Sequence, residues 1–132
     1  MKTIKKYVLI IVSLALFSCG SAVKFPISSV TPAADISAKK KTDSNNNFVL
    51  EIIARNLASA DRLNPPGKVY SVWVVNKQNE VMNVGQMDIK NAQKSTFKTA
   101  TPFDFDEVFI TVEDQGDLKY PAGMEIARTK IK

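Results

Sequence analysis

An apolar stretch near the middle of the chain, Lys68–Asn76, has the sequence KVYSVWVVN. It contains the single Trp and four Val, and no charged residue lies between Val69 and Val75. β-Branched and aromatic side chains are favoured on the pleated, largely buried surface of a sheet. Because both alternating faces of the stretch are mostly apolar, it is predicted to be a central strand that is covered on both sides.

The segments on either side alternate apolar and polar residues, which is typical of half-buried strands. Phe48–Leu57 also has the spacing of a helix, but the turn-forming run Thr42–Asn47 precedes it and favours a strand. Pro102–Phe105 is predicted to be a corner, and Gly85 to mark a bulge or a close backbone approach. The other predicted strands are Phe25–Val30, Ala34–Lys41, Glu80–Ile89, Lys94–Thr101, Asp106–Asp114 and Met124–Ile131.

Short strands at intervals of about 10–12 residues predict an all-β fold, an antiparallel immunoglobulin-like β-sandwich of about seven strands. This domain is expected to span residues 25–132, after a signal peptide (1–18) and a short tether (19–24). The chain has no Cys…Trp…Cys arrangement, so Trp73 is expected to pack on aliphatic side chains instead of a disulfide.

The N-terminus has the pattern of a bacterial signal peptide. The basic segment Met1–Lys6 precedes Tyr7–Phe17, an uncharged apolar run. About 11 residues are too few to cross a bilayer core of roughly 30 Å, so no membrane span is predicted. The run ends in Leu16-Phe17-Ser18-Cys19, which resembles the bacterial lipobox.

The lipobox resemblance implies cleavage between Ser18 and Cys19, a diacylglycerol on the Cys19 thiol and a fatty acid such as palmitate on its new α-amine. The alternative is an ordinary secretory signal that ends in Cys19 by chance. In the best-known sorting rule an Asp after the lipidated Cys retains lipoproteins on the inner membrane. Gly20 stands there instead, which favours the outer membrane, facing the periplasm.

The net charge of +5 does not indicate a nucleic-acid partner. Three lysines lie in residues 1–18, so the remainder has 15 Lys+Arg against 13 Asp+Glu and a net charge of only +2. Most of the basic character therefore belongs to the targeting segment. The run Lys39–Lys41 is interpreted as the polar end of a strand, with a phosphate or lipid-headgroup patch as the alternative.

The absence of His and the single Cys exclude His-based catalysis, Cys/His zinc sites and an internal disulfide. We therefore expect that the protein is not an enzyme and that it binds no metal or cofactor. Two acidic groups could serve a hydrolase, which is the weakest alternative, but strand ends normally carry solvated charge. These groups are Asp104, Asp106 and Glu107, and Glu113, Asp114 and Asp117.

Several segments together resemble the C-terminal domain of anti-sigma-K factors. They are Tyr70-x-Val72-Trp73, Gly85, Pro102-Phe103-Asp104, Phe109–Glu113 and Tyr120–Gly123. The resemblance implies an extracytoplasmic β-sandwich. The sigma-binding part of that family is a separate helical domain, often with a His/Cys zinc site, so direct sigma-factor inhibition is not implied for this chain.

The function that these patterns favour is a membrane-anchored, non-catalytic lipoprotein module that binds or supports an envelope protein or peptide. The alternative is a sensory accessory of an anti-sigma-factor system. If Val49, Ile53 and Phe109 face solvent, they form an apolar patch of the kind that marks a contact site. The competing interpretation is that a second sheet covers them.

Overall fold

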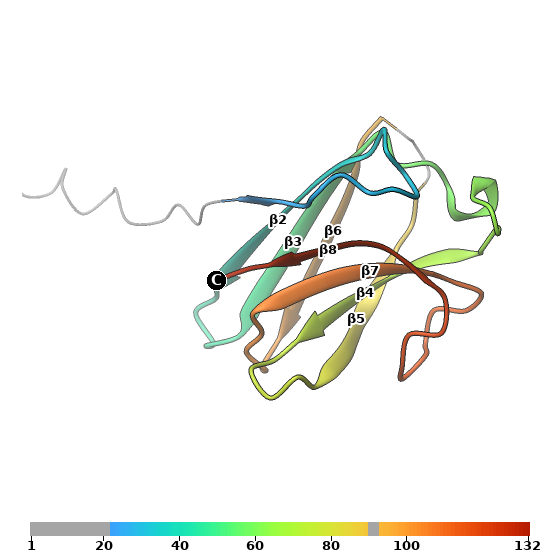
Figure 1. The fold of residues 1–132 in the computed structure, drawn as a ribbon. Helices are drawn as coiled ribbons and strands as arrows, with labels where there is room; N and C mark the ends of the chain where they lie inside the picture. Colours follow the sequence, from blue (N-terminus) through green and yellow to red (C-terminus); the bar gives the residue numbers. More distant parts are fainter. Residues whose placement is uncertain (1–21, 90–92) are drawn as a thin grey trace, which may run out of the picture.

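The structure, a computed structural model, describes residues 22–89 and 93–132. The predicted cleavage and lipidation sites, Ser18 and Cys19, lie outside the described residues. The sequence also predicts a turn at residues 90–93, and most of it lies outside the described residues as well. Within the described ranges, eight strands form two antiparallel sheets that pack face to face (Figure 1). The prediction of an all-β sandwich is confirmed.

Sheet A has the strand order β1-β2-β3-β6, and sheet B has the order β5-β4-β7-β8. The strands of sheet A are β1 (Val23–Lys24), β2 (Asp35–Thr42), β3 (Phe48–Arg55) and β6 (Ser95–Thr101). Those of sheet B are β4 (Val69–Val75), β5 (Val81–Met87), β7 (Glu107–Glu113) and β8 (Met124–Lys130). The chain crosses between sheets after β3, β5 and β6, which is the immunoglobulin-like arrangement.

The first strand was predicted at Phe25–Val30, but it lies at Val23–Lys24, so the predicted position is wrong. β1 is only two residues long, and Phe25 adds one more hydrogen bond to β2, from its amide to the Ile36 carbonyl (2.9 Å). Pro26 has no N–H to continue the ladder. The Ser28 hydroxyl then accepts hydrogen bonds from the Val30 and Thr31 amides, which turns the chain away from the sheet.

The turn predicted between β2 and β3 is confirmed. One carboxylate oxygen of Asp43 accepts hydrogen bonds from the amides of Asn45 (2.8 Å) and Asn47 (2.9 Å). Asn46 has a φ of 62°, which Asn tolerates better than most residues. Hydrogen bonds from Asn47 lower the pKa of Asp43. The same chemistry ends β3, since Asn56 has a φ of 56° and stops the strand at Arg55.

The main core lies between the sheets and is built from the alternating inward residues of both. Its largest fully buried members include Tyr70, Leu50, Ile52, Ile110 and Phe105. The phenol of Tyr70 donates a hydrogen bond to the Ala58 carbonyl (2.6 Å) and so holds the loop before β4. Burial raises the pKa of Tyr70 to about 12, with Asp61 adding to the shift, so this donor keeps its proton at neutral pH.

Gly85 lies at a register shift between β4 and β5, as predicted. Its φ is +139°, and a Cβ there would lie 3.0 Å from the ring of Phe97 on β6. Both the unusual backbone conformation and the close approach therefore require glycine at this position.

Trp73 is not part of the core between the sheets. The sequence predicted that it packs on aliphatic side chains, whereas it stacks on the aromatic ring of Phe109. On β4 the side chains of Tyr70, Val72 and Val74 point inward, so Trp73 and Val75 point to the opposite face of sheet B. Both are nevertheless buried. The strand is thus covered on both sides, as expected, but its second cover is not a sheet.

Candidate functional site

The outer face of sheet B carries a second, smaller cluster of buried side chains, which we call the outer cluster. Trp73 stacks on Phe109, with ring centroids 6.1 Å apart and an angle of 12° between the planes. Arg128 of β8 lies over the other side of the Phe109 ring, 4.0 Å from its centroid. Val75 completes the buried cluster, and Val81 and Leu118 pack against it.

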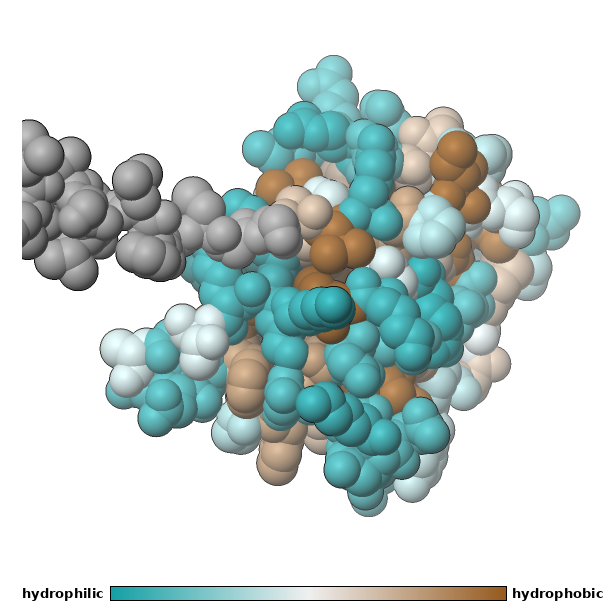
Figure 2. Space-filling view, turned by 60° about the vertical axis from the view of Figure 1, so that its left-hand side comes forward, coloured by the Kyte–Doolittle hydropathy of each residue, from teal (hydrophilic) through white to brown (hydrophobic). Residues whose placement is uncertain are grey.

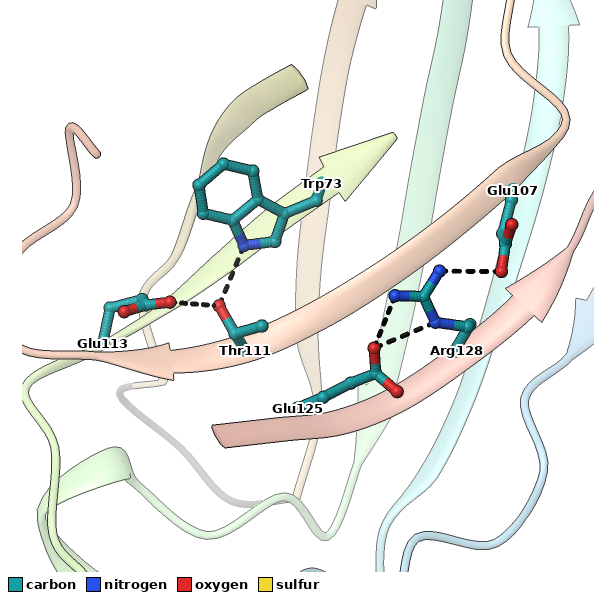
Figure 3. A network of polar contacts seen from close by, with 6 residues as sticks. All are labelled: Trp73, Glu107, Thr111, Glu113, Glu125 and Arg128. Carbon is teal, nitrogen blue, oxygen red and sulfur yellow. Dashed lines mark hydrogen bonds and ion pairs between the residues drawn. The ribbon is translucent and has the colours of Figure 1, made fainter. Parts of the chain in front are cut away.

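Two acidic side chains hold Arg128 in this position (Figure 3). It donates hydrogen bonds to Glu107 (2.8 Å) and to Glu125 (2.6 and 2.9 Å). These hydrogen bonds, above all those to Glu125, raise the pKa of Arg128. A guanidinium stacked on Phe109 and fixed by two carboxylates closes one side of the outer cluster.

A chain of buried hydrogen bonds closes the other side (Figure 3). The Trp73 indole donates to the Thr111 hydroxyl (2.8 Å), which donates to Glu113 (2.8 Å). The Glu113 carboxylate also accepts hydrogen bonds from the amides of Ala122 and Gly123, at 2.8–3.0 Å. Glu113 is 3% exposed, so its charge is stabilised by these donors and not by solvent.

The loop between β7 and β8, residues 114–123, folds back over this face because Glu113 binds its far end. The Asn83 amide of β5 donates hydrogen bonds to the carbonyls of Gly116 (2.9 Å) and Leu118 (3.0 Å). At the end of the loop, a Cβ on Gly123 would lie 1.7 Å from the Val112 carbonyl oxygen. Only glycine therefore permits this close return of the chain.

The structure does not bring together the three residues predicted to form an apolar patch. Val49 and Ile53 are half-buried on the outer face of β3 in sheet A, whereas Phe109 is on the outer face of sheet B. Phe109 is only 2% exposed. The condition for the patch, that Phe109 faces solvent, is therefore not met. Phe109 is covered, as the competing interpretation expected, but by Arg128 and Trp73 instead of a second sheet.

A different aromatic residue is exposed on this side of the molecule. Tyr120, in the folded-back loop, is 74% exposed. It shares a shallow groove of about 410 Å³ with the partly buried Val81, Met82 and Leu118, and with Asn83 and Lys119. We call this the Tyr120 groove. No periodicity marks Tyr120, since it lies in a loop whose path depends on Glu113.

The two predicted acidic groups are divided among separate structural roles. Asp104 pairs with Lys40, Glu107 pairs with Arg128, and Glu113 binds the loop amides. Within residues 22–89 and 93–132, no three His, Cys, Asp or Glu side chains lie close enough to hold a metal ion. The groups therefore do not converge on one site.

A larger cavity of about 760 Å³ lies at the end of the sandwich near β1. We call it the lysine pocket, because four lysines line it together with two aspartates and three apolar residues. Its lining is Val23, Lys40, Lys77, Asp104, Phe105, Asp106, Lys130, Ile131 and Lys132.

Of the four lysines in the pocket lining, only Lys40 takes part in one of the ion pairs found among the described residues. Its ammonium donates to Asp104 (2.5 Å) and to the Phe105 carbonyl, and lies over the Phe105 ring. The hydrogen bond from Lys40 is the main reason that the pKa of Asp104 is lowered, and the charge of Lys77 lowers it further. Lys40 thus points inward while Lys39 and Lys41 point outward, so the Lys39–Lys41 run forms no single patch.

Compared with models of protein families, with curated proteins and with solved structures, the chain matches none. The resemblances to anti-sigma-K factors and to the lipobox therefore stay predictions. In the part of the chain that the structure describes, no helix has the length and hydropathy needed to cross a bilayer.

Proposed function

We propose that the protein is a lipoprotein of the bacterial cell envelope, anchored through lipid on Cys19, whose β-sandwich is a non-catalytic module that binds a protein or peptide. The outer membrane, on its periplasmic side, is the proposed location. The observation that supports the proposal is that the described sandwich starts only a few residues after the predicted lipidation site. Val23, the first residue of β1, comes four residues after Cys19, which is a span of at most about 14 Å.

Replacing Cys19 with Ser is expected to abolish incorporation of labelled palmitate and to release the protein from the membrane fraction. Stable anchoring needs several acyl chains. Each buried CH₂ contributes about 0.8 kcal/mol to membrane binding, so that a single chain binds only marginally. The measurement is fatty-acid labelling with membrane fractionation, and Ser21→Ala is the matched control. Undiminished labelling of the Cys19→Ser protein would overturn the lipid anchor.

The Tyr120 groove is the surface that best fits a protein partner. Tyrosine supplies a large contact area with few rotatable bonds, and interface hot spots are enriched in it. The groove adds the half-buried apolar side chains of Val81 and Met82 beside a polar rim. Its loop is already held by Glu113 and Asn83, so little conformational entropy is lost when a partner binds.

A photoreactive phenylalanine at Tyr120 is expected to give a discrete protein adduct in cells, and Met82→Glu, which places a charge in the groove, is expected to remove it. The control is the same probe at Phe103, an exposed aromatic in the β6–β7 corner that does not line the groove. Absence of the adduct, or the same adduct from Phe103, contradicts the proposed surface. An adduct formed only with proteins of a sigma-factor pathway would favour the sensory accessory instead.

A further inference from the structure

The lysine pocket lies at the end of the sandwich from which β1 starts. Three features meet at this end: the β2–β3 turn, the β6–β7 corner and the end of β8. The strand pairings show this, since Thr42 pairs with Phe48, Phe48 with Thr101, and Glu107 with Lys130. Because β1 runs antiparallel to β2, Val23 is the residue of β1 nearer to this end. Figure 2 turns this end forward and shows hydrophilic side chains around a few apolar ones.

The charge of the pocket favours an anion. Four lysines and two aspartates line it, and the Lys40–Asp104 pair neutralises one charge of each sign. Among the charged side chains of the lining, Lys77, Lys130 and Lys132 then remain against Asp106. All three lysines are exposed and come from two separate segments, the β4–β5 turn and the end of β8. Their ammonium groups can therefore gather around one ligand without breaking an ion pair of the described fold.

The floor and rim of the pocket are amphipathic. Val23, Phe105 and Ile131 supply apolar contact beneath the lysines. Phe103, in the same β6–β7 corner, is 59% exposed. An exposed aromatic residue beside lysines is the combination that interfacial membrane-binding surfaces use, since the ring enters the headgroup region while the ammonium groups bind phosphate.

We propose that the lysine pocket binds the phosphate of an anionic phospholipid headgroup and holds the sandwich with this end against the membrane. The inference rests on the proposed anchor at Cys19. Attraction between lysines and an anionic surface falls off within roughly 8 Å, so it acts only on an end that is kept close. The short tether keeps this end close, and the Tyr120 groove, on the outer face of sheet B, stays free for a partner.

The test uses the lipidated full-length protein in nanodiscs of phosphatidylcholine, with or without phosphatidylglycerol. Lysine acetylation rates are measured by mass spectrometry. Phosphatidylglycerol is expected to slow labelling of Lys77, Lys130 and Lys132 at least fivefold. The internal control is a set of exposed lysines outside the pocket and the Tyr120 groove, which should change less than twofold: Lys68, Lys94 and Lys98.

A second measurement compares two triple variants of equal charge, Lys77→Gln/Lys130→Gln/Lys132→Gln and Lys68→Gln/Lys94→Gln/Lys98→Gln. Phosphatidylglycerol is expected to slow amide hydrogen exchange in residues 102–106 of the unmodified protein and of the second variant, but not of the first. Slowing in the first variant, equal protection of both lysine sets, or no protection overturns the proposal. Equal protection by inorganic phosphate in phosphatidylcholine discs also overturns it, because the site would then bind free phosphate.

The intact mass of the purified protein reports separately whether Cys19 carries lipid. If it carries none, the proposed anchor fails, and the same labelling is carried out in solution with dihexanoyl phosphatidylglycerol. Protection of the three pocket lysines there supports the pocket without the anchor, and absence of protection overturns it.

Discussion

Replacing Trp73 with Ala is expected to lower the free energy of unfolding by about 4 kcal/mol, the cost typical of deleting a buried large aromatic side chain. Trp73 is 0% exposed and stacks on Phe109. Its removal leaves a cavity on the outer face of sheet B and takes the indole donor from Thr111. The loop over this face would lose its packing through Leu118 as well.

Urea unfolding followed by far-UV circular dichroism measures this loss. Tyr120→Ala is the control, because it also removes an aromatic ring from this face, but one that is largely exposed. We expect it to lower the free energy of unfolding by less than about 0.5 kcal/mol. A loss below about 1 kcal/mol for Trp73→Ala would show that the outer cluster is not part of the cooperatively folded unit.

Replacing Glu113 with Gln is expected to destabilise the protein by about 3 kcal/mol. The two carboxylate oxygens accept four hydrogen bonds, and charged acceptors contribute roughly 1.5–3 kcal/mol each. A glutamine keeps one acceptor oxygen and places an NH₂ group at the other position. Whichever way it turns, that NH₂ faces the Gly123 amide, which is itself a donor.

The same amide substitution at the neighbouring Asp114, which is exposed, is the matched control and should change stability by less than about 0.5 kcal/mol. Hydrogen exchange in residues 114–123 should rise in Glu113→Gln more than in the strands of sheet A, because the loop loses its attachment first. Unchanged exchange in this loop would contradict the role assigned to Glu113.

The strands were the predictable part of this molecule. Alternation and turn chemistry are local properties, so β2, β3 and β7 start within a residue of their predicted positions. The helix alternative for Phe48–Leu57 fails because Asp43 closes a tight turn and the next eight residues pair with β2. The first predicted strand fails because Pro26 has no N–H to continue the ladder, and the pairing with β2 ends at Phe25.

The candidate sites were less predictable, because each depends on residues that are distant in the sequence. The lysine pocket joins Val23, Lys40 and Lys77 to the β6–β7 corner and the end of β8. The Tyr120 groove exists because Glu113 holds the far end of a ten-residue loop over β5. Neither arrangement leaves a periodic signal in the sequence.

The sequence by itself determined that the stretch KVYSVWVVN is a buried strand and that Trp73 shares a face with Ser71 and Val75, since a strand alternates with a period of two. It did not determine which face meets the other sheet, because both faces are apolar. Only the tertiary structure decided this. Tyr70 faces the core between the sheets, and Trp73 lies under a loop that a buried carboxylate holds in place.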